Sequence, residues 1–193
     1  MKKVGLFFGT FNPIHNGHLK VADYFLEKGD LEEVWLVVSP HSPFKKKESL
    51  IENRQRIAMA KIASVDFPKI KVCDDEINLP KPSYTFLTLT HLKNKFPEFN
   101  FILILGQDII GHFNRWKNYR DILKDYKVYV YPRVKSIDTP NELKKHRNII
   151  LFNAPKIEIS STAVRKMIYK GEVSLSEIPK KVKDYITINN LFI

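Results

Sequence analysis

The sequence predicts an α/β protein, a Rossmann-like doubly wound parallel sheet with a small helical C-terminal part. Six short apolar runs, rich in β-branched and aromatic residues and bounded by breakers, have the composition of strands buried on both faces. Stretches with the spacing of amphipathic helices separate these runs, so that strand and helix alternate about five times along the chain. This alternation favours a parallel sheet with right-handed crossovers and helices on both faces.

The elements follow from the order of these patterns. The expected strands are residues 4–8, 33–39, 69–73, 100–105, 127–131 and 148–152. Three helical stripes lie between them: Leu19, Ala22, Phe25 and Leu26, ended by Gly29; Leu50, Ile57, Ala60 and Ile62 within residues 49–64; and Phe86, Leu89, Leu92 and Phe96, closed by Pro97. Residues 160–193 show no clear strand before their last few positions and predict two helices packed on the rim of the sheet.

Length and composition fit one domain over residues 1–193, of which 160–193 form a helical subregion. The hydrophobic content of 44% and the charged content of 27% are ordinary for a folded soluble protein. No apolar stretch reaches the roughly 20 residues that span a bilayer, and no cleavage site follows the first apolar run. The single cysteine, Cys73, cannot form an internal disulfide. We therefore expect a cytoplasmic protein with no membrane partner.

The formal net charge of +11 is the unusual bulk property of the chain. A nucleic-acid binder would gather its lysines on one face, whereas an enzyme that uses nucleoside triphosphates needs only a positive cleft. Lysines that solvate helix faces are the plainer interpretation. Charge alone does not choose among the three.

The stretch GTFNPIHNGH, residues 9–18, follows the first expected strand, and ligands of such sheets bind beyond the carboxyl ends of the strands. Gly9 permits a close backbone approach and a positive φ, while Pro13 pushes Asn12 toward an extended conformation. Asn16 is the expected N-cap of the following helix, which places His18 in the first helical turn. The free amides and the dipole of that helix N-terminus favour an anion.

The two histidines of this stretch, His15 and His18, can point to the same side of a helical turn. An imidazole donates a hydrogen bond to a phosphate oxygen whether it is neutral or protonated, so the loop is interpreted as a phosphate cradle. A zinc site is a weaker interpretation, because zinc needs three or four protein ligands and the chain has no supporting cysteine cluster. Histidines that merely cap a surface helix are the plainest alternative.

GTFNPIHNGH closely resembles the G-[ST]-F-[DN]-P-x-H-x-G-H signature of the nucleotidylyltransferase superfamily. Residues 159–165, ISSTAVR, resemble the second signature of that superfamily, I-S-S-T-x-x-R, near the C-terminus. Taken alone, the second stretch predicts a helix capped by Ser160 or Ser161, with Arg165 one turn further on and suited to phosphate. It would equally fit a routine capped helix with a surface arginine.

The resemblance covers nearly the whole chain and points to the nicotinate or nicotinamide mononucleotide adenylyltransferases, the bacterial nicotinate type first. Three segments support it. Residues 43–45, followed by Arg54, Arg56 and Met59, resemble the P-P-H-K and R-x-x-M segments of that family. Residues 83–85 resemble its S-Y-T segment, and residues 106–108 with Trp116 resemble its G-x-D segment and downstream tryptophan. The chain departs from the family pattern at Phe44, Leu87 and Gln107, where a histidine, an acid and a small residue are usual. Phosphopantetheine adenylyltransferases, the chief rival, are shorter and favour threonine where His15 stands.

The resemblance implies transfer of AMP from ATP to nicotinate mononucleotide, giving deamido-NAD and pyrophosphate in NAD biosynthesis. The acceptor is a phosphate monoester, largely dianionic at pH 7, so no general base is required. Trp116 offers the largest aromatic face for a pyridine ring, although a tryptophan that packs a loop is common. Nicotinamide mononucleotide as substrate, phosphopantetheine adenylyl transfer, and a basic RNA-binding protein of a different class remain the alternatives.

The resemblance also assigns residues. Those implied in catalysis are His15, His18, Lys45 and Arg165; those implied in ATP binding are Gly9, Thr10, Phe11, His15, His18, Gly106, Asp108, Arg133, Ser160, Ser161, Thr162 and Arg165; those implied in mononucleotide binding are Asn12, Lys45, Tyr84, Thr85 and Trp116. Mg²⁺ is expected to be held mainly by substrate phosphates and water, with no protein metal site. The expected partners are ATP and nicotinate mononucleotide and no nucleic acid; the oligomeric state is left open, a homo-oligomer included.

Overall fold

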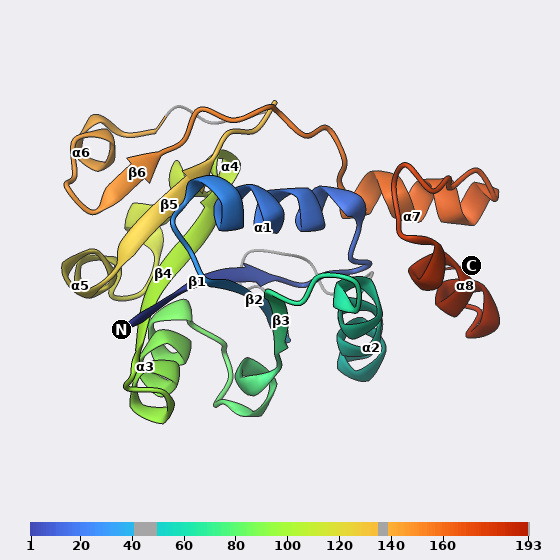
Figure 1. Cartoon of the computed structure of the whole chain (residues 1–193), viewed down its shortest axis with the longest axis horizontal. Helices are drawn as coiled ribbons and strands as arrows, with labels where there is room; N and C mark the ends of the chain where they lie inside the picture. The colour runs from blue at the N-terminus through green and yellow to red at the C-terminus, as the bar shows by residue number, and fades with distance from the viewer. Residues whose placement is uncertain (41–49, 135–138, 193) are drawn as a thin grey trace.

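The computed structural model describes residues 1–40, 50–134 and 139–192 and contains a six-stranded sheet. The strands are β1 (Lys2–Gly9), β2 (Glu33–Val38), β3 (Ile70–Cys73), β4 (Phe99–Gly106), β5 (Lys127–Tyr131) and β6 (Ile149–Leu151). Their order is β3-β2-β1-β4-β5-β6 and every neighbouring pair is parallel. This confirms the six expected strands and the doubly wound α/β class (Figure 1).

Helices follow the strands; five of the eight in the described residues match the three predicted stripes and the two predicted C-terminal helices, whereas the three short ones after β4 and β5 were not predicted. They are α1 (Asn16–Lys28), α2 (Asn53–Ser64), α3 (Thr85–Lys95), α4 (Gln107–Ile110), α5 (Tyr119–Asp125), α6 (Asn141–Lys144), α7 (Ser161–Lys170) and α8 (Lys180–Ile188), with 3₁₀ turns η1 (Asp75–Asn78) and η2 (Phe113–Arg115). Two boundaries differ from the prediction. The second helix begins at Asn53 rather than near residue 49, and α8 continues to Ile188, where the sequence had suggested a terminal strand.

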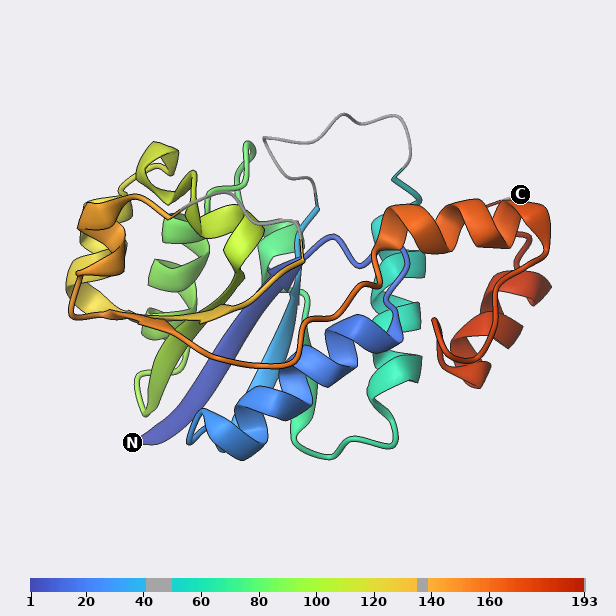
Figure 2. The same ribbon diagram turned by 90° about the horizontal axis from the view of Figure 1, so that it is seen from above.

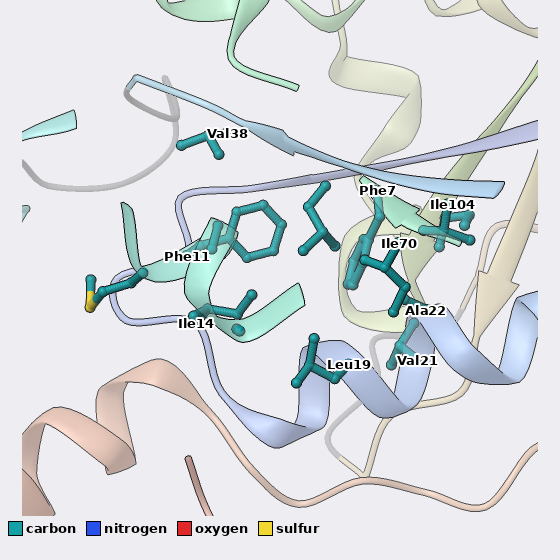
Figure 3. Packing of buried hydrophobic residues seen from close by; sticks show 14 of the residues in the cluster. Phe7, Phe11, Ile14, Leu19, Val21, Ala22, Val38, Ile70 and Ile104 are labelled. Carbon is teal, nitrogen blue, oxygen red and sulfur yellow. The ribbon is translucent and has the colours of Figure 1, made fainter. Parts of the chain in front are cut away.

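Two apolar clusters cover the two faces of the sheet, because successive strand residues point to opposite sides. In β2, Leu36 packs into the cluster that includes the buried faces of α1 and α2, whereas Trp35 packs into the cluster that includes α3 and α5. β4 alternates in the same way through Leu103 and Ile104. Figure 3 shows the first cluster, where Phe7 and Phe11 lie between the sheet and α1.

The buried face of α2 shares only Ala60 with the stripe that the sequence predicts. Its buried residues are Arg56, Met59, Ala60 and Ala63, while Ile57 and Ile62 are only partly buried. A charged side chain therefore occupies the inner face of this helix. Leu50 lies before the helix and not on it.

The C-terminal helices α7 and α8 lie beyond the end of the sheet, next to α2 and the start of α1 (Figures 1 and 2). The Asn16 side-chain amide donates hydrogen bonds to the carbonyl oxygens of Leu175 (2.8 Å) and Ser176 (3.0 Å), so the segment before α8 is fixed to the start of α1. Tyr185 of α8 donates a hydrogen bond to Gln55 of α2. None of the helices within the described residues is long and apolar enough to span a membrane.

The strand order places a topological switch point between β1 and β4. The chain leaves β1 toward β2 on one side and leaves β4 toward β5 on the other, so the loops after these two neighbouring strands diverge. A crevice at the carboxyl ends of such strands is the usual ligand site of doubly wound sheets. The stretch at residues 9–18 and the residues after Gly106 border this crevice.

Candidate active site

The loop after β1 has a different local structure from the one the sequence predicts. Gly9 does not adopt a positive φ; Phe11 does, at 46°. A side chain on Gly9 would lie 2.9 Å from the Phe11 ring, so glycine is needed there for space. The Phe11 ring is 1% exposed and packs edge-on against Phe7 and His18, with centroids 6.0 and 5.0 Å apart. The strained backbone of the loop is thus held by an anchored ring.

His15, and not Asn16, is the N-cap of α1. Its backbone N–H donates a hydrogen bond to Nδ1 of His18 (3.2 Å), and the two imidazole rings stack with centroids 3.7 Å apart. The side-chain amide of Asn16 is directed instead to the C-terminal segment. His18 does lie in the first helical turn, as expected.

This geometry assigns a tautomer to His18. A ring nitrogen that accepts a hydrogen bond carries no proton, so neutral His18 bears its proton on Nε2. His15 is 2% exposed, and burial, aided by the positive charge of Arg133, lowers its pKa from 6.5 to about 3. His15 is therefore neutral at pH 7 in the free protein, and it and the Nε2–H of His18 can both donate hydrogen bonds.

The start of α7 lies against this loop. Ser160 is the N-cap of α7 and accepts a hydrogen bond from the backbone N–H of Ala163 (3.2 Å), which decides between the two serines that the sequence left open. The Ser161 hydroxyl donates to the carbonyl oxygen of Pro13 (3.1 Å). Arg165 Nη1 donates to the carbonyl oxygen of Asn12 (2.7 Å). The two signature segments are joined directly.

The ends of β4 and β5 contribute a charged pair. Arg133 Nε lies 3.6 Å from the carboxylate oxygen Oδ1 of Asp108. A side chain at Gly106 would overlap the Asp108 carboxylate and approach Arg133 Nε to 3.2 Å, so this glycine keeps space for the pair. Gln107, one of the departures from the family pattern, is the first residue of α4.

These segments enclose one cavity of about 620 Å³. It is lined by Thr10, Asn12, His15, His18, Leu50, Asp108, Arg133, Val134, Ile157, Glu158, Ile159, Ser160, Ser161, Thr162 and Arg165. Most residues assigned to the triphosphate therefore lie around a single space. Its volume is in the range of small-molecule sites.

The structure does not bring every assigned residue to this cavity. Gly9, Phe11 and Gly106 support its walls without lining it. Three residues assigned to the mononucleotide, Tyr84, Thr85 and Trp116, are also absent from its lining.

Those three residues lie elsewhere at the same edge of the sheet. Tyr84 is the N-cap of α3, and its ring lies 4.5 Å from Lys117 Nζ, next to Trp116 in sequence. Trp116 packs on Phe113, with ring centroids 5.1 Å apart, and is half-buried. Lys45 and Phe44 fall outside the described residues, and Leu87 is an exposed residue of α3.

Sequence reasoning missed the apolar and connecting part of the lining. Leu50, Val134, Ile157 and Glu158 line the cavity, although none carried a motif. Ile157 belongs to the extended connection from β6 to α7, which crosses the top of the molecule in Figure 1. The only sequence feature that could have identified Ile157 is its place just before the second signature.

Among residues 1–40, 50–134 and 139–192, no group of three or more His, Cys, Asp or Glu side chains could hold a metal ion. The carboxylates that line the cavity are Asp108 and Glu158. This donor set suits a cation that arrives with phosphate oxygens and keeps water ligands.

Comparison with known proteins identifies the family of the chain. A family model described as cytidylyltransferase-like matches residues 6–167. The chain is 46% identical, over 98% of both chains, to the "Probable nicotinate-nucleotide adenylyltransferase" of Flavobacterium johnsoniae. Two structures of Plasmodium falciparum nicotinic acid mononucleotide adenylyltransferase, complexed with APC and with NaAD, superpose with a TM-score of 0.81 at 25% identity, covering 100% of this chain and 98% of theirs. The chain therefore belongs to the cytidylyltransferase-like family and, within it, to the nicotinate-nucleotide adenylyltransferases.

Proposed function

We propose that the chain transfers the adenylyl group of ATP to nicotinate mononucleotide, releasing pyrophosphate and forming deamido-NAD in NAD biosynthesis. The observation that carries this proposal is the pair of hydrogen bonds from Ser161 and Arg165 to Pro13 and Asn12, which closes the two signature segments around one cavity. The relatives named for this activity and the neighbour complexed with NaAD support the choice of substrates.

The reaction begins when an oxygen of the mononucleotide phosphate attacks the α-phosphorus of ATP. The bond between the α-phosphorus and the bridging oxygen to the β-phosphate breaks, and pyrophosphate leaves with that electron pair. The attacking dianion needs no base, so catalysis consists of bringing two anions together and stabilising the charge that moves to the leaving group. We assign to His18 Nε2–H the role of donating to the α-phosphate, and the hydrogen bond at Nδ1, which orients the ring, supports this role.

Different walls of the cavity suit different parts of ATP. The first turn of α7, with Ser161, Thr162 and Arg165, offers hydroxyls, backbone amides and a guanidinium to the β- and γ-phosphates. Asp108 suits the ribose hydroxyls, while its partner Arg133 offers a second cation to the phosphates. The apolar side chains Val134, Ile157 and Ile159 suit the adenine base.

Mg²⁺ is proposed to enter with the triphosphate, held mainly by phosphate oxygens and water, and the carboxylates that line the cavity are Asp108 and Glu158. When bound, the ion neutralises part of the phosphate charge. The chain itself contributes the imidazoles and guanidiniums that orient the triphosphate.

The acceptor is proposed to bind beside the ATP cavity, toward Tyr84, Thr85 and Trp116. The half-buried indole of Trp116 presents the aromatic face that a pyridinium ring needs, and cation–π attraction adds to stacking. Lys45 remains our candidate for the acceptor phosphate. We also propose that the reaction takes place in the cytoplasm, in keeping with the lone cysteine, Cys73.

The test is incubation of the purified chain with ATP, Mg²⁺ and one acceptor at a time, followed by quantification of dinucleotide and pyrophosphate. We expect deamido-NAD with nicotinate mononucleotide and a lower kcat/KM with nicotinamide mononucleotide. Turnover of phosphopantetheine in place of both would assign the chain to the rival branch. Salt-sensitive RNA binding without any adenylyl transfer would overturn the enzymatic proposal altogether.

A further inference from the structure

Arg56 is a completely buried arginine whose side chain lies behind the active-site loops rather than in the cavity. It belongs to the first turn of α2 and is 0% exposed. It does not line the cavity, and no step of the proposed reaction uses it. A buried guanidinium without partners would be very costly, so its surroundings must explain its presence.

The guanidinium donates hydrogen bonds to five acceptors. Nη1 donates to the carbonyl oxygens of Thr10 (2.5 Å) and Ser39 (2.8 Å), Nη2 to the carbonyl oxygen of Pro40 (3.1 Å) and to Asn53 Oδ1, and Nε to the carbonyl oxygen of Ile51 (3.3 Å). Four of the five are backbone carbonyls. They come from the loop after β1, the chain just after β2, and the segment that enters α2. One side chain therefore joins three segments.

Two of these hydrogen bonds connect Arg56 to residues of the cavity wall. Thr10, whose carbonyl accepts from Arg56, lines the cavity. The backbone N–H of Ile51 donates to Asn12 Oδ1 (3.3 Å), and the Asn12 carbonyl accepts from Arg165. A continuous set of hydrogen bonds thus runs from Arg56 through residues 10–12 to α7.

A carboxyl group from η1 joins this cluster of hydrogen bonds. Glu76 is 3% exposed and accepts a hydrogen bond from the Ser39 hydroxyl (3.1 Å), while the Ser39 carbonyl accepts from Arg56. The planar fork of an arginine satisfies several acceptors at fixed angles, which the single nitrogen of a lysine cannot do. The site therefore requires arginine specifically, and not just a positive charge.

We propose that Arg56 is a positioning residue for adenylyl transfer: its guanidinium fixes the backbone of residues 10–12, and through it the orientation of the imidazoles of His15 and His18 toward the triphosphate. The inference rests on the proposed function. It differs from a purely structural role, in which Arg56 would stabilise the fold without affecting the chemistry of molecules that remain folded.

The principal test compares Arg56→Lys with Arg54→Lys, the same change at an exposed arginine two residues earlier. At a temperature where circular dichroism shows each variant fully folded, we expect Arg56→Lys to lower kcat/KM for ATP by about thirtyfold, through a lower kcat together with weaker ATP binding, and Arg54→Lys by less than about twofold. Unchanged kinetics in Arg56→Lys, or a loss confined to the melting temperature, would overturn the inference.

A double-mutant cycle with His18→Ala separates positioning from structure. If Arg56 acts through residues 10–18, Arg56→Lys lowers kcat/KM by a much smaller factor when His18 has already been replaced with alanine. The factors by which Arg56→Lys lowers kcat/KM with and without His18 should then differ by more than about threefold. Factors that agree within threefold show that the two changes act independently and reject the proposal. If Arg56→Lys does not fold, Asn53→Ala, which removes one acceptor at the edge of the cluster, enters the same cycle under the same criterion.

A measurement of the binding of ATP alone tests this inference separately from the proposed function. If the wild-type chain forms no deamido-NAD, the proposed function fails, and the rise in melting temperature that ATP causes is then compared between Arg56→Lys and Arg54→Lys. A smaller ATP-dependent rise in the variant than in Arg54→Lys supports positioning of the cradle. Equal rises in the two variants overturn it.

Discussion

Arg165 Nη1 donates a 2.7 Å hydrogen bond to the backbone carbonyl oxygen of Asn12, which lies 153 residues earlier in the chain. The Ser161 hydroxyl makes the same kind of bond to the carbonyl oxygen of Pro13. The second signature therefore has a structural role beside the phosphate binding that we propose, because two of its side chains hold the first signature in place. Arg165 combines a positioning contact with a guanidinium edge that lines the cavity.

Replacing Arg165 with methionine removes both contributions while keeping the apolar stem of the side chain. We expect kcat/KM for ATP to fall by about a hundredfold or more, since a charged donor to the phosphates and the Asn12 contact are lost together. Lys166→Met, at the exposed neighbouring position of α7, is the control and should stay close to wild type. Similar losses in both variants would show that charge near α7, and not the specific contact, matters.

His18→Ala removes the donor that we place at the α-phosphate. Turnover is expected to fall by about a hundredfold or more, as for loss of one oxyanion donor, with a smaller effect on KM for ATP. Steady-state kinetics of the folded variant test this, with His146→Ala as a control outside the cavity lining. Near-normal turnover in His18→Ala would remove His18 from the reacting phosphate.

Trp116→Ala probes the acceptor side, which the ATP cavity does not include. The loss of the indole face should raise KM for nicotinate mononucleotide about tenfold or more and leave ATP affinity unchanged. Isothermal titration with each substrate separates the two effects. If both affinities stay at the wild-type level, Trp116 only packs on Phe113 and does not contact substrate.

The fold could be predicted because its signals are local and repeated. Each of the six strands is a short apolar run, and the alternation with helices leaves few arrangements of a parallel sheet. The polar segments after β1, β4 and β5 could be placed at one edge for the same reason. Thr10, Asp108 and Arg133 line one cavity, as this argument requires.

What the sequence did not predict depends on contacts between segments far apart in the chain. An arginine on a helical stripe suggests solvent, yet Arg56 is buried because three segments present carbonyls to it. Asn16 has a good N-cap side chain, but Leu175 and Ser176 accept its amide protons and His15 takes the N-cap position. No local pattern records where these partners fold.

The buried imidazole of His15 predicts a dependence of stability on pH. Its folded pKa of about 3 lies below the unfolded value of 6.5, so the unfolded chain binds more protons between these limits and stability falls as the pH falls. Between pH 6.5 and pH 5 the loss is about 2 kcal/mol. In urea unfolding experiments, His15→Gln should lack this part of the decline. Parallel profiles for the variant and the wild type would mean that His15 is charged or exposed in the folded protein.

The buried Glu76 predicts a dependence of stability on pH that is opposite in sign to that of His15. Because the two effects overlap, the pH profile of the wild-type protein alone would not reveal the contribution of Glu76. Burial raises the folded pKa of Glu76 from 4.5 to about 7, against the lowering effects of the Ser39 hydroxyl and the Arg56 charge. Between pH 4.5 and 7 the folded chain binds the extra proton, so stability falls as the pH rises, by about 3 kcal/mol in total. This change in stability partly cancels the change that His15 causes over the pH range that the two residues share.

The variant Glu76→Gln isolates this contribution, because glutamine keeps the shape of the protonated acid at every pH. Any difference in stability between glutamine and the protonated acid gives an offset that does not vary with pH. Relative to wild type, its free energy of unfolding should therefore rise by about 3 kcal/mol between pH 4.5 and pH 8. Urea unfolding at pH 5, 6, 7 and 8 measures the difference, with the exposed Glu98→Gln as the control. A difference that stays constant with pH would mean that Glu76 ionises in the folded protein as it does in the unfolded chain, and that Arg56 is paired with a full charge throughout.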